Sequence, residues 1–173
     1  MNMLENRKIL IVDDEKGIQK IFSRILSPPL KTDVLSRGAA LFGETDEKPV
    51  STTPDHFDLV FADSGEDAIK AVENAITKKQ PFSLVFMDIG LPGIDGVETV
   101  RHIWKADPDM KIIFVTGSMH FERKNICIAT GREDFFYIGK PFNIKEISEL
   151  AHTLGEQWLN ERKQERTRLY ERQ

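Results

Sequence analysis

The sequence predicts an α/β fold in which a five-stranded parallel sheet lies between two layers of helices. Short apolar runs alternate with amphipathic stretches along the chain, in the order strand then helix, five times over. Most of the runs are continuously apolar, which is typical of strands that are buried on both faces. Neighbouring parallel strands need crossover helices, and right-handed crossovers place helices on both faces of the sheet.

The first four elements come from two apolar runs and the periodic stretches that follow them. Residues 8–12 form a strand that stops at two acidic residues, and residues 59–62 form the second strand. After each strand, apolar residues recur with the spacing of one helix face, and Pro28 ends the first helix. The two predicted apolar faces are Ile18, Ile21, Phe22 and Ile25, and Ile69, Val72 and Ile76.

The remaining elements repeat this pattern. Residues 82–87 form the third strand, and the loop after it is rich in glycine and proline. A helix follows, with a predicted apolar face of Val97, Val100, Ile103 and Trp104. The fourth strand is residues 112–115, a weak helix is predicted over 121–129, and the fifth strand is residues 135–138. From Asn143 onward the chain is predicted to be helical.

Two segments lie outside the alternation. We expect one domain over residues 1–155 with an inserted loop at 28–56, which is longer than most connections in compact domains, and a C-terminal helical extension over 156–173. In the last helix, apolar residues recur at the 4-3-4 spacing of a coiled-coil seam. This seam is Ile147, Ala151, Leu154 and Trp158. It makes a homodimer through this helix one expectation, and a solvated, frayed end is the alternative for residues 160–173.

Composition excludes several classes of protein. The chain has 173 residues, a formal net charge of −4 and a single cysteine. The negative charge argues against nucleic acid as a partner, because phosphate binding needs a basic face. One cysteine cannot form an internal disulfide, which favours a cytoplasmic protein. No apolar run approaches the roughly 18 residues of a membrane span, so we expect no membrane partner.

Four of the predicted strands end on side chains that can do chemistry. Asp13 and Asp14 follow the first strand, Asp88 the third, Thr116 the fourth and Lys140 the fifth. In a parallel sheet these ends share one edge, where such folds carry their sites. Three close carboxylates repel one another unless a cation lies among them, and an all-oxygen set suits Mg²⁺. A carboxylate beside a metal and a lysine can attack phosphorus, so these residues predict a metal-assisted phosphoryl acceptor.

The strings around these residues resemble the receiver domains of two-component response regulators. They are ILIVDDE at 9–15, MDIGLPGIDG at 87–96, FVTGS at 114–118 and GKPF at 139–142. Each string alone is a modest signal, but all four in order at strand ends are a strong one. The resemblance covers about residues 8–26 and 57–155. It implies a flavodoxin-like, doubly wound fold of five strand–helix units in three layers.

The resemblance also implies a role for each strand-end residue. Asp88 resembles the aspartate that receives the phosphoryl group. Asp13 and Asp14 resemble the acidic pair that holds Mg²⁺, with Asp14 as the direct ligand. The backbone carbonyl of Gly90 is similar to the third protein ligand of the metal. Lys140 resembles the lysine that stabilises charge on the phosphoryl oxygens.

A switch is implied by the same resemblance. Thr116 resembles the hydroxyl that moves toward the phosphoryl group, and Tyr137 resembles the aromatic residue that fills the vacated space. The change would create a new surface on the fourth helix, fifth strand and fifth helix of the family fold. The Lys140-Pro141 bond resembles the cis peptide of the family, which is plausible because cis X-Pro bonds cost little.

Two alternative functions are compatible with the same residues. One is a Mg²⁺-dependent phosphohydrolase with an aspartyl nucleophile, although such an enzyme would have a second Asp at position 90, where this chain has Gly. The other is a structural binding module that is never phosphorylated. Singly, Asp13-Asp14 could cap a helix, Asp88 could begin an Asx-turn and Lys140 could be a surface charge. Gly90 and Ser118 depart from the resemblance, because both are smaller than the residues that many members of the family carry there.

We expect a signalling domain that catalyses only its own phosphorylation and dephosphorylation, and not an enzyme acting on other substrates. The partner implied is a histidine kinase or a phosphotransfer protein, which would supply the phosphoryl group to Asp88. No helix-turn-helix, kinase core or cyclase motif is recognisable in the sequence. The protein would therefore act by protein contact, or be the receiver portion of a longer chain such as a hybrid histidine kinase.

Overall fold

The computed structural model describes residues 7–27, 56–117 and 122–171. Within them, five parallel strands form one sheet in the order β2-β1-β3-β4-β5. The strands are β1 (Lys8–Val12), β2 (Asp58–Ala62), β3 (Leu84–Asp88), β4 (Lys111–Thr116) and β5 (Phe136–Gly139). Order and direction confirm the predicted doubly wound α/β fold.

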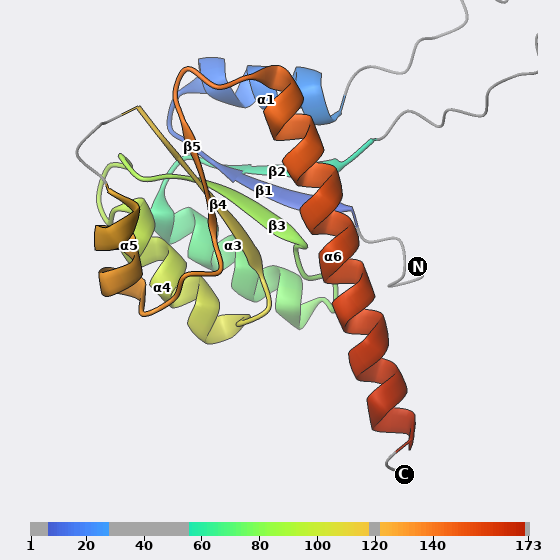
Figure 1. Ribbon diagram of the computed structural model, residues 1–173. Helices are drawn as coiled ribbons and strands as arrows, with labels where there is room; N and C mark the ends of the chain where they lie inside the picture. The colour runs from blue at the N-terminus through green and yellow to red at the C-terminus, as the bar shows by residue number, and fades with distance from the viewer. Residues whose placement is uncertain (1–6, 28–55, 118–121, 172–173) are drawn as a thin grey trace, which may run out of the picture.

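Helices cover both faces of the sheet (Figure 1). On one face lie α1 (Lys16–Leu26) and α6 (Ile144–Glu171). On the other lie α3 (Gly65–Thr77), α4 (Gly96–Ala106) and α5 (Arg123–Thr130). Each helix layer forms an apolar core with the face of the sheet that it covers. Phe22 and Phe86 belong to the core on the α1–α6 side. Val72, Val100 and Phe114 belong to the core on the other side. The three-layer arrangement is therefore the one that the alternation predicts.

The face that α1 buries agrees with the predicted one at Ile18, Phe22 and Ile25, which pack in the core, and differs from it at Ile21. Gln19, Phe22 and Leu26 are the buried residues of this helix, whereas Ile21 is 38% exposed. The side of the helix that faces the core also includes Gln19, a polar side chain that the apolar periodicity does not predict. The Gln19 amide donates hydrogen bonds to the carbonyl of Asp13 and to Asp63 Oδ1. These hydrogen bonds offset the usual free-energy cost of burying an amide. The predicted face of α4, in contrast, is buried throughout.

The predicted seam of the last helix is buried within the chain itself. Ile147, Ala151, Leu154 and Trp158 are at most 2% exposed, and the first three belong to the core between α6 and the sheet. The pairing interpretation of this seam is therefore wrong, because a helix that lies on its own sheet produces the same spacing. The helix continues without a break past residue 155 and projects beyond the sheet (Figure 1).

Most of the predicted insert, residues 28–55, lies outside the described residues, as does Ser118. The residues on either side of the insert meet: the Phe57 N–H donates to the carbonyl of Leu26 at 2.9 Å. The Ser27 hydroxyl also lies 2.9 Å from the ring of His56. The end of α1 and the start of β2 are therefore held together directly. Among the helices that the structure describes, none is both long and apolar enough to cross a membrane.

Candidate functional site

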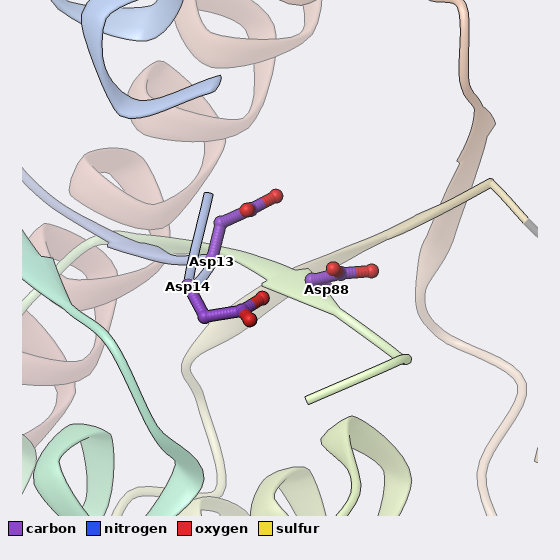
Figure 2. Close-up of side chains that lie close together, drawn as sticks. All are labelled: Asp13, Asp14 and Asp88. Carbon is purple, nitrogen blue, oxygen red and sulfur yellow. The ribbon is translucent and has the colours of Figure 1, made fainter. Parts of the chain in front are cut away.

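Three carboxylates meet at the carboxyl edge of the sheet. Asp13 and Asp14 follow β1, and Asp88 is the last residue of β3 (Figure 2). Because Val12 is in register with Met87, the residues that follow each of them are neighbours at the edge. One oxygen from each carboxylate lies within 4.8 Å of the others. The acidic residues that the strand ends predict are therefore brought together.

The backbone of Asp88 is fixed by the start of α4. A Cβ on Gly96 would lie 2.1 Å from the carbonyl oxygen of Asp88, so only glycine allows the helix to approach this closely. The N–H of Gly96 donates to the carbonyl of Ile89 at 3.1 Å, and Asp95 caps α4 through the N–H of Glu98. The GIDG segment after Asp88 therefore packs a helix start against the strand end and holds the carboxylate at the edge.

Lys140 follows β5 and extends across the acidic cluster. Its ammonium lies 2.8 Å from Asp13 Oδ2, 3.3 Å from Asp88 Oδ2 and 3.4 Å from Glu15 Oε1. Its backbone N–H donates to the carbonyl of Thr116 at 2.6 Å, which attaches it to the end of β4. The Lys140-Pro141 peptide is cis, as the resemblance implies. One cation is therefore shared by carboxylates from two strand ends.

Burial and charge act against each other in this cluster. Burial raises the pKa of Asp13 above its ordinary value, and the hydrogen bond from Lys140 only partly offsets this effect. Burial also acts to lower the pKa of Lys140, but the hydrogen bond to Asp13 and the charge of Asp88 raise it overall. Lys140 is thus held in its charged form, and Asp13 would ionise more readily with additional positive charge nearby.

Local turn and cap roles account for these residues only in part. The N-cap of α1 is Glu15, which makes no side-chain cap, so neither Asp13 nor Asp14 caps this helix. The Gly90 N–H does donate to Asp88 Oδ1 at 3.3 Å, so Asp88 also makes an Asx-type contact. Lys140 has a side chain that is only 15% exposed, and it is not a free surface charge. The cluster is therefore more than a set of local turn and cap residues.

The donor set fits a magnesium ion. Two oxygens on opposite sides of Mg²⁺ are roughly 4 Å apart, and the carboxylate oxygens here are within 4.8 Å of one another. Asp14 is exposed and can approach a cation from solvent, while Asp13 and Asp88 are buried. Gly90 is exposed, and a Cβ at this position would come no closer than 4.0 Å to Asp88 Oδ1. Its surroundings are therefore open to an ion and its waters.

The two predicted switch residues lie on the same face of neighbouring strands. Thr116 is buried at the end of β4 and is in register with Gly139, while Tyr137 is in register with Phe114. Tyr137 is partly buried against the core under α3 to α5. A Cβ on Gly139 would meet nothing within 4 Å. Space is thus present beside Thr116, on the strand that carries Tyr137.

Glu15 is a site residue that sequence reasoning missed. Its carboxylate lies 3.4 Å from the Lys140 ammonium, and its N–H donates to Asp13 Oδ1 at 2.8 Å. The signal that could have found it is the run of three consecutive acids, Asp13-Asp14-Glu15, in which only the first two have a predicted role. A third acid near the same lysine increases the negative charge of the site.

The described residues thus form a doubly wound parallel sheet with an acidic cluster and a lysine at its carboxyl edge, as the sequence resemblance implies. The chain belongs to the response regulator receiver domain family, whose model matches residues 51–152. The match begins at residue 51, near the end of the insert, and the structure adds β1 and α1 to it, with Asp13 and Asp14 at the end of β1. The protein therefore contains a receiver domain of two-component signalling.

Individual relatives agree with this assignment. The chain is 32% identical over 85 residues to the response regulator receiver protein CpdR of Brucella abortus, covering 49% of this chain and 65% of that protein. It is 30% identical over 105 residues to the aerobic respiration control protein ArcA of Escherichia coli K12, covering 58% of this chain and 43% of ArcA. The match thus spans less than two thirds of either protein.

A solved structure shows the same fold. The chain superposes on a CheY-like receiver domain protein from Methanospirillum hungatei JF-1 with a TM-score of 0.62 and 25% sequence identity. The superposition covers 89% of this chain and 97% of that one. The described strands and helices therefore form a complete receiver fold.

Proposed function

We propose that this protein is the phosphoacceptor of a two-component relay, in which Asp88 takes a phosphoryl group from a histidine kinase or a phosphotransfer protein in the presence of Mg²⁺. One observation carries the proposal: the ends of three strands, β1, β3 and β5, bring Asp13, Asp14, Asp88 and Lys140 together at one edge. Packing of the core requires no such arrangement, whereas phosphoryl transfer to a carboxylate does.

Asp88 is the nucleophile in this proposal. One of its carboxylate oxygens attacks phosphorus, a new O–P bond forms, and the P–N bond to the donor histidine breaks. The imidazole leaves with the electron pair of that bond and keeps its place on the donor protein. The Lys140 ammonium, 3.3 Å from Asp88 Oδ2, is placed to stabilise the charge on the transferring phosphoryl oxygens.

Mg²⁺ would be held by Asp14, Asp88 and the carbonyl of Gly90, with Asp13 alongside. When bound, it supplies positive charge that offsets the acidic cluster and the phosphoryl oxygens. Asp13 keeps Lys140 in place through the 2.8 Å contact, and Glu15 restrains the same ammonium from the solvent side. The protein part of the site is therefore organised before a donor arrives.

The proposed switch uses Thr116 and Tyr137. The Thr116 hydroxyl would donate to a phosphoryl oxygen, and the ring of Tyr137 would turn toward the space beside Gly139. Open space at Gly139 supports this step. The surface that would change is formed by α5, β5 and α6, where Ile128, Phe136 and Ile144 are 72%, 43% and 63% exposed. Exposed apolar residues of this size fit a surface that binds a partner.

A homodimer through α6 remains a proposal for the part of the helix beyond Trp158. The seam residues up to Trp158 are buried in the chain, whereas Leu169 is 59% exposed. Sedimentation of the full chain with and without beryllofluoride would test it. Mass that doubles with beryllofluoride, and not when Leu169 is replaced by Glu, would support pairing, and an unchanged monomer would rule it out.

The phosphoacceptor proposal is tested with acetyl phosphate as a small donor. We expect the wild-type chain to gain the mass of one phosphoryl group in Mg²⁺ and none in EDTA, by intact mass spectrometry. Asp88→Asn should gain none. Asp58→Asn is a matched control, because Asp58 is an exposed carboxylate at the amino end of β2, at the opposite edge of the sheet, and it should behave as wild type. Full labelling of Asp88→Asn would overturn the assignment of the acceptor.

The two alternative functions give different results in the same assay. A phosphohydrolase would turn over a small phosphoester many times without accumulating the phosphorylated chain. A structural module would neither bind Mg²⁺ nor become labelled. Gly90 counts against the hydrolase, since a second Asp is missing there. Accumulation of one stable phosphoryl group per chain would separate the receiver from both.

A further inference from the structure

Asp13 has every one of its hydrogen-bonding groups occupied. Its N–H donates to the carbonyl of Ala62 at 3.1 Å. Its Oδ1 accepts from the Glu15 N–H at 2.8 Å, and its Oδ2 accepts from the Lys140 ammonium at 2.8 Å. Its backbone carbonyl accepts from Gln19 Nε2 at 2.7 Å. Of these four partners, Gln19 is the one whose side chain holds the backbone of the acidic pair.

Gln19 is placed for this contact. Its side chain belongs to the buried face of α1, and the residue is 8% exposed. The same Nε2 also donates to Asp63 Oδ1 at 2.6 Å, so the amide joins the end of β1 to the loop after β2. An apolar residue would fill this space without the need for polar partners. The amide is therefore best explained by the two oxygens that it joins.

Asp63 completes the contact from the other side. It accepts from Lys16 at 2.6 Å as well as from Gln19. α1 has no side-chain cap and no acid in its first turn, so Asp63 provides negative charge near a helix start that otherwise lacks it. The hydrogen bonds from Lys16 and Gln19 hold the pKa of Asp63 below its ordinary value. The acceptor in this contact is therefore a carboxylate with a fixed charge.

We infer that Gln19 and Asp63 form a brace that positions the acidic pair for binding a divalent cation. Gln19 holds the backbone of Asp13, and Asp14 is the next residue, with an exposed carboxylate. The position of that carboxylate relative to Asp88 thus depends on the backbone that the brace fixes. The inference rests on the proposed function, because it assigns to Gln19 and Asp63 the role of positioning residues for the proposed metal site.

The direct test is Gln19→Met, which keeps the length of the side chain and removes the amide. We expect the dissociation constant for Mg²⁺, measured by calorimetry on the full chain, to rise about tenfold. The rate of phosphorylation by acetyl phosphate at saturating Mg²⁺ should stay within about twofold of wild type, because the variant weakens binding and leaves the reacting groups in place. A lost structural contact alone would move the midpoint of thermal unfolding but not the Mg²⁺ concentration for half-maximal rate.

A matched control is Gln157→Met. Gln157 is an exposed residue of α6 that donates to Glu161 Oε1 at 2.8 Å. The control loses the same amide and one hydrogen bond, but none that reaches the acidic pair. Its Mg²⁺ dissociation constant should equal that of wild type. If both substitutions weaken Mg²⁺ binding equally, the brace is wrong.

Asp63 gives a second test that does not depend on the folding of Gln19→Met. Asp63 has a side chain that is 53% exposed, so its replacement is expected to be tolerated. Asp63→Ala should weaken Mg²⁺ binding, and Asp63→Asn should largely restore it, because the amide oxygen still accepts from Gln19. The double variant Gln19→Met/Asp63→Ala should be no weaker than Gln19→Met alone, since both changes break one contact. Additive effects would contradict a shared brace.

Failure of the brace and failure of the proposed function are distinguishable. If wild-type protein neither binds Mg²⁺ nor accepts a phosphoryl group, the proposed function fails, and the inference falls with it. If wild type does both and the Gln19 and Asp63 variants bind Mg²⁺ as wild type does, the inference alone is overturned.

Discussion

Two buried acid–base pairs lie at opposite ends of the sheet. At the carboxyl end, Asp13 is 2% exposed and lies 2.8 Å from the Lys140 ammonium. Near the amino end, Asp107 is 4% exposed and lies 3.0 Å from the Arg162 guanidinium of α6. Burial raises the pKa of both carboxyl groups. Judged by burial, distance and pKa, the two pairs are nearly the same.

The two pairs differ in the number of charged residues around them. Asp13 shares Lys140 with Asp88 and Glu15, and Asp14 is close by, so four acids gather around one base.

At the other end, Arg162 lies between Asp107 and the exposed Asp109, and its guanidinium is 5.1 Å from the Trp158 ring centroid. Four acids around Lys140 leave more negative charge unbalanced than two acids around Arg162, so the first arrangement can accept a cation, whereas the second attaches a helix to a loop. A buried pair is the better candidate for a site where more charge remains to be balanced.

Removal of Lys140 is expected to have the largest effect. Lys140→Met should lower the rate of phosphorylation by acetyl phosphate by about 100-fold, because a charge aimed at the transferring phosphoryl oxygens is lost. Arg162→Met, at the other pair, should leave this rate unchanged. Both rates are measured by intact mass spectrometry at a temperature where the variants are folded. Equal losses in the two variants would contradict the distinction.

The second expected effect concerns stability. Arg162→Met should lower the free energy of unfolding by about 2 kcal/mol, because Asp107 is left buried without its partner. Urea unfolding measures it. Arg166→Met, an exposed change on the same helix, should alter stability by less than about 0.5 kcal/mol. If the two variants are equally stable, the pair near the amino end does not attach α6 to the domain.

Magnesium should stabilise the folded protein by binding at the acidic cluster, and not through the pair near the amino end of the sheet. At ten times its dissociation constant, Mg²⁺ should add about 1.4 kcal/mol to the free energy of unfolding. This gain should disappear in Asp14→Asn and persist in Asp107→Asn. Denaturant unfolding in Mg²⁺ and in EDTA measures the difference. A gain that survives Asp14→Asn would place the ion somewhere other than the acidic cluster.

The smallest expected effect is on pH dependence. Burial raises the pKa of Asp107 above its ordinary value of 3.8, against the opposing charge of Arg162. The folded state therefore holds this proton more tightly than the unfolded chain does. As pH rises from about 4 through the raised pKa, wild type should lose stability relative to Asp107→Asn, and the difference should then stay constant. If the stability of wild type rose with pH relative to Asp107→Asn, the pKa of Asp107 would not be raised in the folded state.

The fold could be predicted from the sequence because parallel strands that are buried on both faces appear as continuous apolar runs. Residues 8–12 were predicted and observed as β1 with the same bounds. The third strand was predicted to begin at Phe82, yet β3 begins at Leu84. Phe82 is buried in the chain before the strand, so the apolar run is longer than the strand itself. Apolar runs report burial, which extends beyond hydrogen-bonded strands.

The acidic cluster could be predicted because each member follows a strand, and parallel strand ends share an edge. The brace could not. Gln19 and Asp63 are 44 residues apart and separated by the insert, and a glutamine on an apolar helix face gives no signal for its partner. The partner of the α6 seam could not be predicted for a related reason. Apolar spacing shows that a helix buries one face, but it does not show whether the sheet of the same chain or a second chain covers that face.

The most direct measurement identifies the residue that carries the phosphoryl group. The chain is phosphorylated with acetyl phosphate and Mg²⁺, the acyl phosphate is reduced with borohydride, and the peptides are sequenced by mass spectrometry. The account predicts that the converted residue is Asp88, with no conversion in EDTA. Conversion of Asp13, Asp14 or any other acid in place of Asp88, or labelling that is equal in Mg²⁺ and EDTA, would contradict it.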